Sequence, residues 1–296
     1  MTTTPPDGWR EQPALPLALP THPLKRAIRV ALGLVIAALR PQRLKSLLTA
    51  LDPATLTTAD RWMLSAHVHR QTLRGDQALA QRIHKAFWQS EAAAEWMGGD
   101  SRYREMFLVH HIGIVDPLVA AARAMGAKRL HEIGCGRGDV LRHMAQAMPF
   151  LQSLTGLDLN ARLLDDARQH TQDPRIRFVA TDASQWLAEN ATAQDIVLTN
   201  GGVYEYWTQS QLQAHFSRLS QLRPAVVALV EPLNPQHDFS TQPDSMPYGY
   251  EGSLSHNYPA LLQACGFTVT FQQRITLQGG PYPWLLLVAT LPAQTS

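Results

Sequence analysis

The sequence is poor in cysteine, with only Cys135 and Cys265 in 296 residues. Two cysteines cannot build the dense disulfide framework of small secreted domains, and neither has neighbours at a metal-ligand spacing. His67 and His69 are also too close in sequence to bind one metal from the same face of a helix. We therefore expect a reduced, cytoplasmic protein, and we assign no metal.

Charge is also scarce, because only 17% of the residues are charged and the formal net charge is +2. A nucleic-acid partner would call for basic residues clustered on one face, so we expect none. Hydrophobic residues make up 45% of the chain, which is ample for a buried core. A length of 296 residues predicts one large domain, or one domain with an appendage.

One apolar run, residues 30–39, is too short to cross a bilayer, which takes roughly 20 residues. It belongs to a helix expected over residues 24–39, which begins with Lys25, Arg26 and Arg29 and follows a proline-rich arm. A signal peptide would instead carry its basic residues at the very N-terminus. We expect a buried helix and no stable membrane insertion. An interfacial membrane helix and the wall of a greasy substrate tunnel remain alternatives.

In the first third of the chain, the sequence pattern predicts helices and no strands. After the arm at residues 1–23, we expect a helical lid or appendage over residues 24–110, followed by the main domain at 111–296. The expected helices cover residues 24–39, 43–51, 58–73, 77–97 and 101–125, the last one restarting at Asp116-Pro117.

After Gly126 the pattern changes to short apolar strands that alternate with helices, which is typical of a parallel sheet. The strands are predicted at 129–133, 153–157, 176–180, 195–199, 225–230, 267–275 and 284–291. The helices between them are predicted at 139–148, 161–170, 184–190, 209–222 and 256–265. We expect an α/β fold with a doubly wound, mostly parallel seven-stranded sheet. A hairpin joins the last two strands, so the sheet should end in an antiparallel strand.

The first predicted strand runs into three alternating glycines, Gly134, Gly136 and Gly138, and then into a helix. Glycines let a ligand lie against the main chain, and the helix N-terminus attracts a negative group. The dinucleotide fingerprint is Gly-x-Gly-x-x-Gly, which differs from the spacing here. Glu132 precedes the glycines and would repel a pyrophosphate, whereas it suits an ammonium group or a water network. A nicotinamide-dependent oxidoreductase is therefore disfavoured.

Asp158 follows Gly138 by twenty residues, at the end of the second predicted strand, where a carboxylate can accept from both ribose hydroxyls. Together with Glu132-x-Gly-x-Gly-x-Gly, this resembles the class I S-adenosylmethionine-dependent methyltransferases of the small-molecule type. The resemblance covers residues 126–292 and implies a Rossmann-like fold and S-adenosylmethionine as cofactor. It also implies that Asp182 accepts from the adenine amine while the neighbouring main chain reads the ring. The predicted cofactor residues are Glu132, Gly134, Gly136, Gly138, Asp158, Leu159, Asp182, Ala183 and Asn200.

Catalysis of methyl transfer depends mainly on alignment, and only a hydroxyl or amine acceptor also needs a base. Candidate bases near the expected cleft are His110, His111, Tyr204, Glu205, His215, Glu231, His237 and His256. We predict His111, Glu205, Tyr204 and Glu231 as catalytic residues.

The absence of one motif makes one class of methyl acceptor unlikely. Enzymes that methylate nucleobase or glutamine amino groups usually carry Asn/Asp-Pro-Pro-Tyr/Phe after the fourth strand, but this chain has Asn200-Gly201-Gly202-Val203. The resemblance to lid-bearing members of the family implies O-methylation, at a hydroxyl or carboxylate, of a secondary metabolite or acyl-type compound, and the apolar helix at residues 24–39 favours a greasy acceptor. N- or S-methylation of a small metabolite and a non-catalytic cofactor-binding partner protein are the alternatives, and a homodimer is left open. Aromatic residues could line the acceptor pocket or pack the lid on the sheet: Tyr103, Tyr204, Tyr206, Trp207, Tyr248 and Tyr250.

Overall fold

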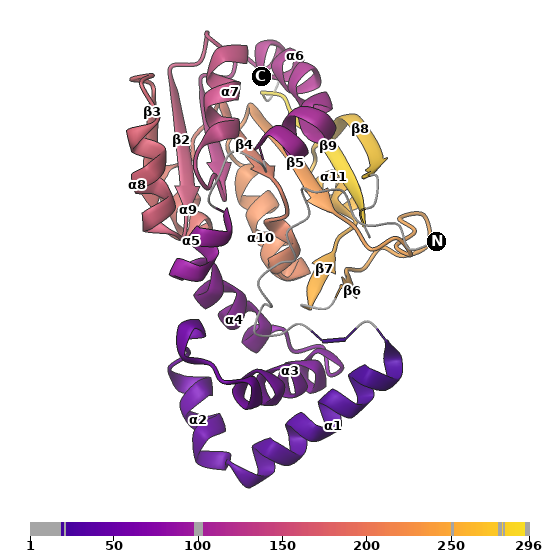
Figure 1. Cartoon of the computed structure of the whole chain (residues 1–296). Helices are drawn as coiled ribbons and strands as arrows, with labels where there is room; N and C mark the ends of the chain where they lie inside the picture. The colour runs from indigo at the N-terminus through magenta and orange to yellow at the C-terminus, as the bar shows by residue number, and fades with distance from the viewer. Residues whose placement is uncertain are drawn as a thin grey trace, which may run out of the picture. The chain divides into compact units, whose positions relative to one another are not determined.

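The computed structural model describes residues 19–20, 22–97, 103–249, 252–277, 280 and 282–293 (Figure 1). The chain divides into two compact units. The helical unit includes residues 10–96 and 247–254, and the α/β unit includes residues 97–246 and 255–296. Residues 1–18 of the predicted arm lie outside the described residues, and the predicted domain limits remain predictions.

One sheet of seven strands forms the centre of the described part of the α/β unit, in the order β3-β2-β1-β4-β5-β9-β8. The strands are β1 (Arg129–Ile133), β2 (Ser153–Asp158), β3 (Ile176–Ala180), β4 (Asp195–Asn200), β5 (Ala225–Pro232), β8 (Thr268–Thr276) and β9 (Pro283–Leu291). The first five pair in parallel, while β9 is antiparallel to both β5 and β8. The predicted fold class is confirmed.

The sheet was predicted to end in its antiparallel strand, and this prediction is wrong. The antiparallel strand β9 lies between β5 and β8. The reason is visible in the burial of the two strands. Eight of the nine residues of β9 are buried, whereas β8 alternates between exposed and half-buried residues along most of its length. A strand that is apolar on both faces belongs inside a sheet, and a strand with a polar face suits its edge.

Helices cover both faces of this sheet (Figure 1). Buried side chains of α6 (Val115–Ala124), α7 (Asp139–Ala147) and α8 (Ala161–Gln169) form the core on one face. Those of α9 (Ala183–Asn190), α10 (Gln209–Leu219) and α11 (Tyr258–Ala264) form the core on the other. The remaining helical segments of this unit are the π-helix η2 (Tyr103–His111) and the short 3₁₀ turns η3 (Ile112–Ile114) and η4 (Tyr204–Tyr206). The strand ends are thereby left as the place for a ligand.

One helical run among the described residues, Tyr103–Ala124, is long and apolar enough to cross a membrane by length and composition alone. Its side chains of Phe107, Ile114 and Leu118 are buried in the core against the sheet. This is how the core helix of a folded domain places its apolar residues.

The helical unit contains α1 (Pro23–Leu39), α2 (Pro41–Thr49), η1 (Pro53–Thr55), α3 (Thr58–Thr72), α4 (Ala78–Trp88) and most of α5 (Glu91–Met97). The helix predicted over residues 77–97 is therefore two helices. The side chain of Thr57 caps α3, and Asp60 accepts from Arg43 at 2.8 and 3.0 Å. The hydrogen bonds from Arg43, together with those from Thr57, outweigh burial and hold the pKa of Asp60 well below its usual range.

A short hairpin, β6 (Met246–Tyr248) with β7 (Ser253–Ser255), was not predicted from the sequence. Its tip, residues 247–254, groups with the helical unit although it follows β5 in the chain. Tyr248 lines a cavity of about 220 Å³ inside that unit, together with residues such as Arg26 and His69.

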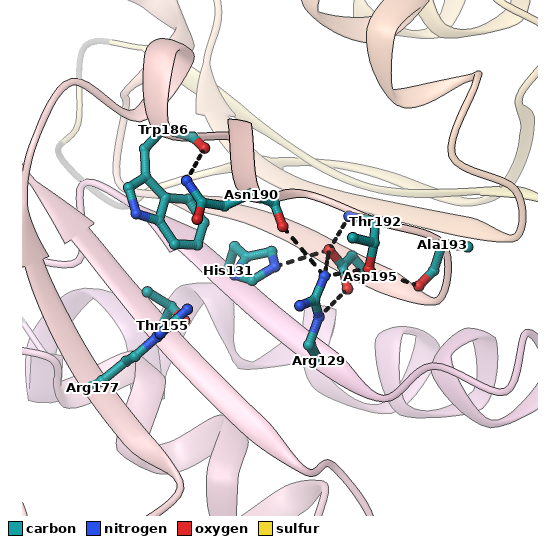
Figure 2. Close-up of polar contacts among 9 residues, drawn as sticks. All are labelled: Arg129, His131, Thr155, Arg177, Trp186, Asn190, Thr192, Ala193 and Asp195. Atoms are coloured by element: carbon teal, nitrogen blue, oxygen red, sulfur yellow. Dashed lines mark hydrogen bonds and ion pairs between the residues drawn. The ribbon is translucent and has the colours of Figure 1, made fainter. Parts of the chain in front are cut away.

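A buried polar cluster fastens β1 to β4 at the amino-terminal end of the two strands (Figure 2). Arg129 donates to both oxygens of Asp195 at 2.7 Å, and His131 Nε2 lies 3.0 Å from the same carboxylate. The main-chain N–H of Thr192 adds a further bond of 2.7 Å. Burial raises the pKa of Asp195, but the hydrogen bonds from His131 and Arg129 outweigh it and leave that pKa below its ordinary value. The cluster lies at the opposite end of the strands from the glycine turn and serves to hold the sheet together.

Candidate active site

The outer glycines of the turn after β1 are fixed by packing. Gly134 and Gly138 both have positive φ, at 69° and 73°, which other residues rarely adopt. A Cβ on Gly134 would lie 2.6 Å from the side chain of Val203, and one on Gly138 would lie 2.6 Å from the ring of Phe178. Only glycine therefore fits at positions 134 and 138 without displacing these neighbours.

The middle glycine is less crowded. A Cβ on Gly136 would meet only the end of the Met97 side chain, at 3.5 Å, and a Cβ on Gly201 after β4 would meet nothing within 4 Å. Because β1 and β4 are adjacent and parallel, both positions lie at the same edge of the sheet. The main chain there has room for a ligand.

Asp158 ties the glycine turn to the end of β2. Its two carboxylate oxygens accept the main-chain N–H groups of Gly136 and Asn160, each at 2.8 Å. Burial raises the pKa of Asp158, and these hydrogen bonds oppose that shift. A carboxylate has about four lone-pair sites, so Asp158 can still accept from a ligand hydroxyl.

Glu132 is buried beneath the turn, and its Oε2 has no hydrogen-bond partner among the described residues. Burial raises its pKa well above the usual range, and the charges of Asp139 and Asp158 act in the same direction. A buried carboxyl with an unsatisfied oxygen is costly by itself. A cationic group in the cleft would supply both a counter-ion and a donor.

The remaining predicted cofactor residues also lie at carboxyl ends of strands. Leu159 directly follows β2. Asp182 follows β3 and caps α9 by accepting from the main-chain N–H of Ser184 at 3.0 Å, and Ala183 is the first residue of that helix. Asn200 is the last residue of β4.

His111 is buried beside the end of β4. Its Nδ1 lies 3.0 Å from Oδ1 of Asn200, and its ring packs against Trp284 with 4.8 Å between centroids. With Oδ1 of Asn200 facing the ring as an acceptor, Nδ1 is the donor of this contact and Nε2 is the basic nitrogen. Ile133 pairs with Thr199 across the two strands, so this histidine stands close to the glycine turn.

Two other predicted catalytic residues are fully buried and engaged inside the protein. Both carboxylate oxygens of Glu231 lie 3.0–3.2 Å from the main-chain N–H groups of Val203 and Tyr204. Burial raises the pKa of Glu231 to about 8. The Tyr204 hydroxyl lies 2.9 Å from Nε2 of His215. These contacts hold the turn that follows β4. Glu205, in contrast, is only half-buried.

The other buried histidines have partners within the protein. His237 contacts the Ser255 hydroxyl at 2.9 Å, and His256 contacts the carbonyl of Tyr204 at 3.1 Å. Burial lowers the pKa of His215 to about 4 and that of His256 to about 3, so both are neutral at pH 7.

Residues 131–224, which run from β1 to the end of the loop before β5, match the sequence model of a family described as a methyltransferase domain. The chain is a class I S-adenosylmethionine-dependent methyltransferase. None of the curated proteins compared matches it.

Two solved structures similar to this methyltransferase support the fold. A methyltransferase from Leishmania major has 13% identity and a TM-score of 0.55, covering 76% of this chain and 90% of its own. Magnesium protoporphyrin IX methyltransferase from Synechocystis PCC 6803, with bound S-adenosylhomocysteine, has 19% identity and a TM-score of 0.50, covering 71% and 99%. At these identities the likeness concerns the fold.

S-adenosylmethionine is the cofactor of the methyltransferase and supplies a methyl group already activated on a sulfonium. The residues present fit it, because Gly136 is the least crowded glycine of the turn and Oε2 of the buried Glu132 has no hydrogen-bond partner among the described residues. The individual contacts of the nine predicted cofactor residues remain predictions.

Two neighbours of the turn, Met97 and Val203, were not predicted from the sequence, and neither was the pairing of His111 with Asn200. No local pattern indicates a contact between residues so far apart in the chain. Of the aromatic residues proposed for the acceptor pocket, Tyr204 is buried in the core, and the hydroxyl of Tyr103 lies 3.0 Å from Nδ1 of His143. Tyr250 lies outside the described residues.

Proposed function

We propose that this methyltransferase methylates an oxygen atom, of a hydroxyl or carboxylate group, on a small secondary-metabolite or acyl-type acceptor. The observation that carries the proposal is the 3.0 Å contact of His111 with Asn200 at the end of β4. This contact puts the proton on Nδ1 and makes Nε2 the basic atom of the ring. A hydroxyl acceptor needs such a base, because its oxygen becomes a good nucleophile only as its proton leaves.

The roles then divide among the residues at the strand ends. Glu132 would face the amino group of the cofactor, Asp158 its ribose hydroxyls and Asp182 its adenine. Asn200 would orient the imidazole of His111, and Nε2 would take the acceptor proton while the methyl group moves in line between donor and acceptor. Tyr204 and Glu231 would hold the turn that follows β4, since their polar groups are already engaged there.

Glu205 is the second candidate base. It belongs to η4 and is half-buried, so its carboxylate can exchange protons with a ligand more readily than that of Glu231. A carboxylate acceptor would need neither base. We also propose a cytoplasmic location, because the two cysteines, Cys135 and Cys265, are unpaired, which suits a reducing compartment. A homodimer is left open.

The test is transfer of a labelled methyl group from S-adenosylmethionine to a panel of phenols, aliphatic alcohols, carboxylic acids, amines and thiols. We expect products only from oxygen acceptors; methylated amines or thiols alone would refute the proposal. With a hydroxyl acceptor, His111→Ala should lower kcat by about 10²- to 10⁴-fold.

The matched control is His110→Ala, the adjacent histidine, which should retain full turnover. Affinity for S-adenosylhomocysteine should be the same in both variants, so that a loss of turnover is separated from a loss of cofactor binding. Added imidazole should restore part of the activity of His111→Ala. A His111→Ala protein that turns over a hydroxyl acceptor at the normal rate would exclude His111 as the base and favour Glu205.

A further inference from the structure

The sequence predicted a buried helix over residues 24–39, but only Gly33 of α1 is buried. The helix carries an apolar stripe on its outer side, defined as Leu24, Ile28, Leu32, Val35 and Leu39. Their exposed fractions are 64, 50, 44, 55 and 76%. Their spacing of three or four residues puts them within an arc of about 80° around the helix. A single exposed leucine is ordinary, but five aligned side chains make a continuous apolar face.

The opposite side of α1 is occupied by α3, which lies along it (Figure 1). Gly33 is buried in this contact, and a Cβ there would come within 2.2 Å of the main-chain oxygen of Trp62. Arg29 lies over the Trp62 ring at 5.5 Å. The helix is therefore held by its inner side, and the stripe lies on its exposed side. At 17 residues it is also shorter than the roughly 20 that cross a bilayer.

The segment that contains the stripe is strongly basic. Residues 22–51 include six lysines and arginines and no acidic residue, whereas the rest of the chain has 20 basic and 24 acidic residues. Basic side chains stand at both ends of the stripe. Lys25 is exposed next to Leu24, and Arg40 is exposed next to Leu39. An apolar face beside a surplus of positive charge matches a surface that is apolar inside and anionic outside.

We propose that α1 docks this methyltransferase on the surface of an anionic lipid bilayer. The helix would lie in the plane of the membrane, with the stripe at the boundary between head groups and acyl chains. The basic residues around it would contact lipid phosphates. A second copy of the chain suits the stripe less well, because it would bring two segments of surplus positive charge against each other.

The experiment is co-sedimentation of the full chain with vesicles of phosphatidylcholine alone and of phosphatidylcholine mixed with phosphatidylglycerol. We expect binding at least about tenfold stronger to the anionic vesicles, falling as salt is added. Ile28→Gln/Val35→Gln should lower this binding by roughly tenfold or more, because it removes two apolar side chains from the middle of the stripe. Equal binding of wild type and this variant would overturn the proposal.

Matched controls separate the stripe from general stickiness. Leu39→Gln and Leu73→Gln change the same residue type at nearly the same exposure, 76 and 75%, but only Leu39 belongs to the stripe. We expect only Leu39→Gln to weaken binding. Lys25→Gln should reduce binding to the anionic vesicles, whereas Lys128→Gln, an exposed lysine of the α/β unit, should not.

Unchanged thermal stabilisation by S-adenosylhomocysteine confirms that each variant is folded. Sedimentation velocity without lipid tests whether a second copy of the chain covers the stripe instead. A dimer that forms in wild type and disappears in Ile28→Gln/Val35→Gln would assign the stripe to a second copy and overturn the lipid proposal. Absence of binding to both kinds of vesicle would overturn it as well. Neither result depends on the identity of the methyl acceptor.

Discussion

Replacing Glu231 by glutamine tests how a buried acid holds the turn after β4. Both oxygens of this side chain contact the main-chain N–H groups of Val203 and Tyr204. Burial raises the pKa of Glu231 to about 8, and the charge of Glu205 adds to the effect. At neutral pH the folded protein therefore keeps a proton that the unfolded chain releases. Glutamine replaces the protonated acid with a neutral group of similar shape.

The sign follows from proton linkage. Because the pKa of Glu231 is raised from 4.5 to about 8 on folding, its proton stabilises the folded state fully below pH 4.5. This contribution is lost as the pH rises through 8, with a slope of about 1.4 kcal/mol per pH unit. His215 and His256 have lowered pKa values and act oppositely, losing stabilisation as the pH falls below 6.5. These histidines therefore contribute little pH dependence between pH 6.5 and 8. The pKa of Glu132 is also raised, so the effect of Glu231 is read from the difference between wild type and Glu231→Gln.

The assay is urea unfolding at several pH values in this range. Relative to Glu231→Gln, wild type should lose on the order of 2 kcal/mol of unfolding free energy between pH 6.5 and 8. Glu189→Gln makes the same chemical change at an exposed position of α9 and should run parallel to wild type. Parallel curves for wild type and Glu231→Gln would refute the reasoning, because they would mean that folding takes up no proton at this site.

Three further substitutions test the site and the sheet. Asp158→Ala should weaken binding of S-adenosylhomocysteine by about 1–3 kcal/mol in calorimetry, and unchanged affinity would remove Asp158 from the cofactor site. Gly138→Ala should lower the unfolding free energy by about 1–3 kcal/mol more than Gly75→Ala, because both have positive φ but only Gly138 would clash with Phe178. Asp195→Asn should cost about 1–3 kcal/mol at pH 7, and the difference should shrink as the pH falls toward 3; a pH-independent difference would mean that charge is not the cause.

The sequence by itself determined the strand-and-helix alternation and the glycine turn. Short, mostly apolar strands alternate with helices in the sequence, and the predicted starts and ends of β1 to β5 agree with the structure to within about two residues. The turn at Gly134, Gly136 and Gly138 is equally local, because a positive φ at each position restricts it to glycine. The positions of Asp158 and Asp182 beside the cleft could also be predicted, because the carboxyl ends of parallel strands meet at one edge of the sheet.

Only the tertiary structure decided which polar groups meet. His111 and Asn200 are 89 residues apart, and nothing in either neighbourhood specifies their contact. Glu231 reads as a cleft residue in the sequence, yet the fold buries it against the turn at Val203. The place of β9 inside the sheet and the grouping of residues 247–254 with the helical unit are likewise products of packing. Backbone conformation depends on neighbours in the chain, whereas burial and polar partners depend on elements brought together from distant parts of it.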